Sequence, residues 1–169
     1  MPTTPESSET INKQARIKES VPPKLKTALN WLSYLLIPLI VYFGNIEVQT
    51  YLGKKALEST GLPYVNFSEA KANSSTLDKP ILADVSAIWC PSCRKLDQKV
   101  FGNKEVQDVI NANYVFTRLE YESDEGRAFV EKYNISGFPT LLVLDSSGKV
   151  IKQLGLTFDP KQFIAQVKK

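Results

Sequence analysis

The chain's two cysteines, Cys90 and Cys93, stand between a strand-like run and a segment with helical periodicity. Residues 80–86 are almost continuously apolar, which is typical of a central parallel strand. From Cys90 to about residue 112, apolar residues recur at helical spacing, with a break near residues 102–103. The sequence therefore predicts a cysteine pair at a helix N-terminus, where free backbone N–H groups and a partial positive charge stabilise a thiolate.

Composition excludes most other uses of two cysteines. The chain has no histidine, so Cys-His catalysis, Ser-His-Asp catalysis and histidine metal ligands are ruled out. A structural zinc site or an iron–sulfur cluster usually takes four ligands, and this chain has two cysteines. A disulfide across so short a loop would constrain the unfolded chain little. We therefore expect a redox-active pair, with no metal and no cofactor.

Residues 62–169 alternate between the two periodicities. Strands are predicted at 64–67, 80–86, 114–121, 140–144 and 149–154, and helices at 69–77, 90–112, 124–133 and 160–167. This order predicts an α/β domain in which a parallel strand pair is flanked by helices on both faces.

The N-terminal part is organised differently. Residues 1–27 are polar and predict a disordered tail, residues 28–46 are uncharged and mostly apolar, and residues 47–61 are expected to form a helical connector. The apolar run predicts a transmembrane anchor, with a cleaved signal peptide, a buried core helix or an interfacial helix as alternatives. Basic residues gather before the run, which predicts a cytoplasmic N-terminus, an inner-membrane location and an exported or periplasmic domain. The net charge of +3 is small and the basic residues form no single patch, so the sequence indicates no nucleic-acid partner.

Four features together resemble the thioredoxin-like superfamily over residues 62–169. They are the Trp-Cys-Pro-Ser-Cys motif at 89–93, Asp84 six residues before the first cysteine, the Gly-Phe-Pro-Thr segment at 137–140, and the order of elements. Within that superfamily, residues 79–82 and 99–106 are similar to the periplasmic C-terminal domain of DsbD-type thiol:disulfide interchange proteins.

The resemblance implies roles for individual residues. Cys90 would be the attacking thiol, Cys93 the resolving thiol, Asp84 the buried carboxylate that helps to remove the proton from Cys93, and Pro139 a cis-proline facing the disulfide. The substrate groove would be bordered by Trp89, Pro91 and Phe138.

Structural alternatives exist for several of these residues. Asp84 could be a strand-end or capping residue, and Pro139 an ordinary trans turn proline. Trp89 and Phe138 could serve packing alone. We interpret Arg118 and Lys95 as solvated charges.

These observations predict a monomeric, membrane-anchored thiol–disulfide oxidoreductase acting on exported proteins that contain disulfides. The Pro-Ser dipeptide between the cysteines lacks the histidine of strong oxidants, which favours a reductant or a moderate exchanger. The resemblance covers no DsbD-type transmembrane core, so electrons would come from an upstream membrane donor. Two alternatives stay open: a disulfide oxidase or isomerase, and a tethered module that binds a client or Cu(I) through two thiolates.

Overall fold

A computed structural model describes residues 23–168 of the chain. The chain divides into two units between Phe43 and Gly44. The predicted tail, residues 1–27, lies outside the described residues except for its last five, which are helical.

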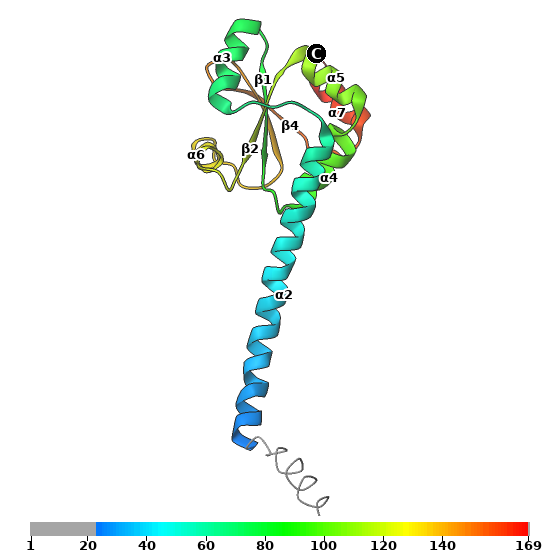
Figure 1. The fold of residues 1–169 in the computed structure, drawn as a ribbon. Coiled ribbons are helices and arrows are strands. Elements are labelled where there is room, and N and C mark those ends of the chain that lie inside the picture. The colour runs from blue at the N-terminus through cyan, green and yellow to red at the C-terminus, as the bar shows by residue number, and fades with distance from the viewer. Residues whose placement is uncertain (1–22, 169) are drawn as a thin grey trace, which may run out of the picture. The chain divides into compact units, whose positions relative to one another are not determined.

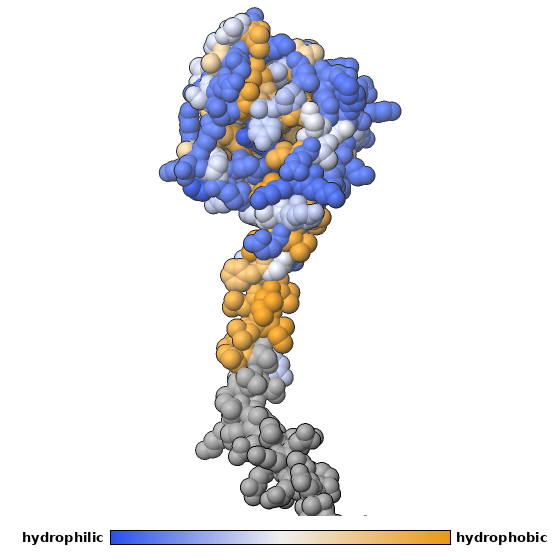
Figure 2. All heavy atoms as spheres, in the orientation of Figure 1, coloured by the Kyte–Doolittle hydropathy of each residue, from blue (hydrophilic) through white to orange (hydrophobic). Residues whose placement is uncertain are grey.

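The first element is a long helix, α2 (Pro23–Thr60), which contains the predicted anchor and the predicted connector. Within the described residues, its segment Tyr34–Thr60 is long and apolar enough to cross a membrane, judged by length and composition. The side chains from Tyr34 to Phe43 are exposed, and Figure 2 shows a hydrophobic surface along this helix. Whether the helix spans a membrane, and where an anchor would begin and end, stay predictions.

A mixed four-stranded sheet forms the centre of the second unit (Figure 1). The strands are β1 (Ile81–Ser86), β2 (Val115–Glu120), β3 (Thr140–Leu144) and β4 (Val150–Leu154). Their spatial order is β2-β1-β3-β4, with β1 parallel to β2 and both other pairs antiparallel. The predicted parallel pair and C-terminal hairpin are confirmed.

Helices cover both faces of this sheet. Helices α3 (Phe67–Leu77) and α6 (Asp124–Lys132) pack on one face, and the other carries α4 (Pro91–Leu96), the π-helical turn η1 (Asp97–Phe101), α5 (Lys104–Asn113) and α7 (Pro160–Val167). In β1, Ile81, Ala83 and Val85 face the first layer and Leu82 faces the second. Because strand side chains alternate, Asp84 and Ser86 point with Leu82 toward α4.

One local prediction differs from the structure, and another is confirmed. The expected strand at 64–67 is wrong: Val65 forms a single parallel bridge with Thr117, and Phe67 already begins α3. The predicted break near 102–103 is confirmed, because Asn103 caps α5 by accepting a hydrogen bond from the Val106 N–H. The π-helical turn before it has no signal in the apolar periodicity.

Candidate redox-active site

The two cysteines lie where β1 ends and α4 begins. Cys90 is the N-cap of α4, and its sulfur accepts a hydrogen bond from the Cys93 N–H at 3.3 Å. Both are free thiols, 7% and 1% exposed respectively. This geometry favours Cys90 as the attacking sulfur and Cys93 as the resolving one, because Cys90 is the more exposed of the two and lies beside a donor that stabilises a thiolate.

The Gly137–Thr140 loop faces the cysteines. The Phe138–Pro139 peptide bond is cis, as the resemblance implied, and Pro139 is buried. The Cys90 thiol donates to the Phe138 carbonyl oxygen, with 3.8 Å between sulfur and oxygen. The Cys90 sulfur is therefore bordered by the backbone of this loop.

Trp89 and Pro91 flank Cys90 in the chain, and Phe138 packs against the cysteines. Trp89 is 41% exposed, Pro91 is exposed, and Phe138 is half-buried. Tyr121, which sequence reasoning did not select, is 38% exposed and packs on the Phe138 ring with centroids 5.2 Å apart. The sequence held one clue to Tyr121, which is its position directly after β2. The carboxyl end of β2 lies beside the carboxyl end of β1, where the cysteines follow. The roles of Trp89, Pro91 and Phe138 as the border of a substrate groove stay predictions.

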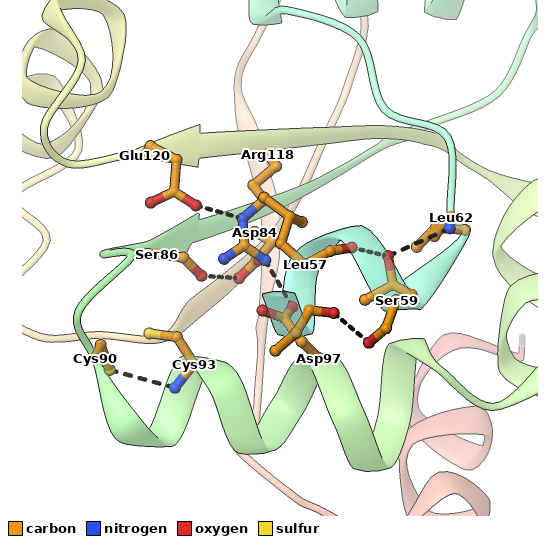
Figure 3. A network of polar contacts seen from close by, with 12 residues as sticks. Leu57, Ser59, Leu62, Asp84, Ser86, Cys90, Cys93, Asp97, Arg118 and Glu120 are labelled. Atoms are coloured by element: carbon orange, nitrogen blue, oxygen red, sulfur yellow. Dashed lines mark hydrogen bonds and ion pairs between the residues drawn. The ribbon is translucent and has the colours of Figure 1, made fainter. Parts of the chain in front are cut away.

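Behind the cysteines lies a buried ion network centred on Arg118 (Figure 3). Arg118 Nη1 donates to Asp84 Oδ2 at 2.9 Å and to Asp97 Oδ1 at 2.7 Å, and Nε donates to Glu120 Oε1 at 2.6 Å. The interpretation of Arg118 as a solvated charge is therefore wrong, since the residue is 6% exposed. Lys95 is exposed, with its ammonium 4.3 Å from the Phe158 ring centroid.

Strand register explains this network. Asp84 of β1 is opposite Arg118 of β2, so both side chains lie on the face covered by α4. The π-helical turn η1 presents Asp97 to the same guanidinium. Asp84 is thus neither a capping residue nor a lone carboxylate, and Ser86 Oγ also donates to its Oδ1 at 2.8 Å.

Asp84 and Cys93 both hold their protons more tightly than in water. Burial raises the pKa of Asp84, and Arg118 and Ser86 offset this only in part. Burial also raises the pKa of the Cys93 thiol, the hydrogen bond with Cys90 adds to this, and the charge of Asp84 contributes further. A raised pKa increases the affinity of the ionised Asp84 carboxylate for a proton, and its role as acceptor of the Cys93 proton stays a prediction.

The network carries more negative than positive groups. Three carboxyls share one guanidinium, so full ionisation would leave excess buried negative charge. Burial and the charges of Asp84 and Glu120 raise the pKa of Asp97 to about 7 despite Arg118. Burial would lower the pKa of Arg118, but the carboxylates outweigh it and raise that pKa, so Arg118 stays cationic. Asp97 is therefore partly protonated near neutral pH, and burial raises the pKa of Asp84 and of Glu120 in the same direction.

The free energy of unfolding should consequently fall as the pH rises toward 7. The folded pKa of Asp97 is above its usual value of 3.8, so between about pH 4 and 7 the folded state binds more protons than the unfolded state. We expect unfolding free energy to drop by about 2 kcal/mol between pH 5 and 7. In Asp97→Asn this drop should be less than half as large, measured by urea unfolding. An Asp108→Asn variant, in an exposed pair with Lys104, should keep the wild-type slope, and equal slopes in all three proteins would contradict this account.

Comparison with known proteins places this site in a family. The family model described as a thioredoxin-like domain matches residues 66–169, which is more than half of the chain. The chain belongs to the thioredoxin-like family. This match spans β1 to β4, both cysteines and Pro139, and it confirms the predicted fold.

Its relatives include thiol:disulfide interchange proteins. DsbD from Haemophilus influenzae is 27% identical over 108 residues, 59% of this chain and 18% of the relative, and DsbD from Yersinia pestis is 30% identical over 90 residues, 51% and 15% respectively. This thioredoxin-like protein therefore spans under a fifth of the length of these relatives.

Solved structures show the same fold. A putative disulphide-isomerase from Bacteroides thetaiotaomicron is 30% identical, with a TM-score of 0.55 over 63% of this chain and 88% of its own. The DsbH oxidoreductase is 22% identical, with a TM-score of 0.56 over 63% and 81%.

Proposed function

We propose that this thioredoxin-like protein is a membrane-anchored thiol–disulfide oxidoreductase that reduces or exchanges disulfides in exported proteins. The observation that carries the proposal is the Cys90 sulfur. It accepts a hydrogen bond from the Cys93 N–H at the start of α4 and donates to the Phe138 carbonyl, and the exposed Trp89 and Pro91 flank it in the chain. The family, with its thiol:disulfide interchange relatives, supports the same chemistry.

The reaction uses both cysteines and the buried carboxyl. The Cys90 thiolate attacks one sulfur of a client disulfide, forms a mixed disulfide and expels the other sulfur as a thiolate. Cys93 then passes its proton to Asp84 and attacks the Cys90 sulfur, which releases the client's second thiolate. Two electrons have moved to the client, and Cys90–Cys93 is left as a disulfide. An upstream membrane dithiol donor would reduce it again.

The anchor completes the proposal. Helix α2 offers an apolar segment long enough to span a bilayer, and the basic residues before it favour a cytoplasmic N-terminus. The redox domain would then lie on the periplasmic side of the inner membrane, with access to exported clients.

Turnover and reduction potential of the full chain in detergent test the proposal. We expect catalytic reduction of a peptide disulfide by dithiothreitol, and a potential nearer thioredoxin's, about −270 mV, than the oxidant extreme of about −120 mV. A potential near −120 mV would reverse the direction of electron flow. Absence of turnover together with stoichiometric Cu(I) binding would replace the proposal with the tethered metal-binding module.

A further inference from the structure

The C-terminal part of α2 touches the turn that leads into the redox motif. Gly53 is buried, and a Cβ atom placed on it would lie 1.8 Å from the Ile88 carbonyl oxygen and 3.0 Å from the Ile88 carbonyl carbon. Ile88 lies two residues before Cys90. Only a residue without a side chain permits so close an approach of helix and turn.

The contact belongs to a continuous stripe on α2. Gln49, Gly53, Ala56 and Thr60 are spaced at i, i+4, i+7 and i+11, which places them on one face of the helix. Ala56 is 2% exposed, whereas Tyr51 on the same helix is 66% exposed. The stripe is therefore an internal contact surface of the second unit, which begins at Gly44.

Both ends of the stripe are held by side-chain hydrogen bonds. Gln49 Oε1 accepts from Arg94 Nη1 at 2.5 Å, and Arg94 directly follows Cys93 in α4. At the other end, Gln107 Nε2 donates to the Thr60 carbonyl oxygen. The helix therefore contacts the turn before Cys90 and also the first turn of the helix that Cys90 caps.

The stripe lies outside the part of the chain that defines the family, because the family match begins at residue 66. We infer that residues 49–60 of α2 are a positioning element for the redox centre, holding the turn at 87–90 through the Gly53–Ile88 contact. That turn is closed by a hydrogen bond from the Cys90 N–H to the Ala87 carbonyl at 2.9 Å. When α2 holds this turn, the Cys90 sulfur stays in line with the Cys93 N–H. The helix therefore helps to stabilise the Cys90 thiolate. The inference rests on the proposed function.

A pair of identical substitutions in one helix tests this role. In Gly53→Ala, the methyl group collides with Ile88 and forces the helix and the turn apart, whereas at Gly44 nothing lies within 4 Å of the added carbon. We expect Gly53→Ala to lose hydrogen-bond stabilisation of the Cys90 thiolate. Reduction of its disulfide by glutathione should then be about tenfold less favourable, which is about 30 mV more negative. Alkylation of Cys90 at pH 7 should slow by a similar factor, and Gly44→Ala should match wild type in both.

Two further variants separate positioning from loss of stability. Gln49→Ala removes the bond to Arg94 without a collision and should shift the glutathione equilibrium in the same direction, about threefold. Gln107→Ala removes bonds to the Thr60 and Phe101 carbonyls, far along the stripe from Cys90, and should lower stability without shifting the equilibrium.

Each outcome decides the inference. A Gly53→Ala equilibrium within twofold of Gly44→Ala, or an equal shift in Gln107→Ala, would overturn it. If Gly53→Ala does not fold, Gln49→Ala tests the inference in its place. A shift of less than twofold in the glutathione equilibrium of Gln49→Ala would then overturn the inference. Failure of the wild-type chain to exchange disulfides would instead remove the proposed function, so the two failures are distinguishable.

Discussion

Replacing Cys93 with serine should convert turnover into capture of the client. A serine hydroxyl cannot attack a disulfide sulfur, so the mixed disulfide between Cys90 and the client would have no internal route to resolution. Cys93 is 1% exposed and differs from serine in one atom, so the fold should persist, and the backbone N–H that serves the Cys90 sulfur is unchanged. We expect turnover to fall at least 100-fold and about one client to be bound per chain, measured by mass spectrometry without reductant.

The matched control is Cys90→Ser. It should show neither turnover nor a stable adduct, because the remaining thiol is buried and burial raises its pKa. Capture of the client by Cys90→Ser as fast as by Cys93→Ser would contradict the separate roles assigned to the two sulfurs. Loss of capture in both variants would point to attack from outside the pair.

Sequence alone was sufficient for the features that depend on local pattern. The strand at 81–86, the helix start at Cys90 and the hairpin after residue 140 follow from runs of apolar residues and from turn residues nearby in the chain. The two cysteines were identifiable because no other residue type in a histidine-free chain offers comparable chemistry.

Features set by contacts between distant segments were missed. Arg118 becomes buried only through the β1–β2 register, and η1 adds Asp97 from a third segment. A partial signal existed, because Arg118 interrupts a strand that is otherwise buried on both faces, and a charge in such a place requires partners. The close contact between Gly53 and Ile88 had no signal in the sequence, because a glycine in an expected helical connector predicts no particular contact.

Arg118→Met should destabilise the protein strongly. Methionine fills much of the same volume but leaves the buried Asp84 and Asp97 and the partly buried Glu120 without their shared cation. Removing one partner of a buried ion pair usually costs about 3–5 kcal/mol. We expect a loss in that range at pH 7, measured by urea unfolding of the full chain in detergent. Lys104→Met, which breaks the exposed pair with Asp108, should change stability little.

The pH dependence distinguishes unpaired charge from lost packing in Arg118→Met. Without the guanidinium, the pKa values of Asp84, Asp97 and Glu120 should rise further, because burial raises each of them and the charge of Arg118 no longer offsets it. Carboxyls with a raised folded pKa stabilise the fold below their unfolded pKa and lose that contribution as pH rises. The penalty should therefore be larger at pH 8 than at pH 5. An equal loss of unfolding free energy at both pH values would mean that Arg118 acts through the packing of its aliphatic chain. It would also mean that Asp84 does not need the Arg118 guanidinium in order to ionise.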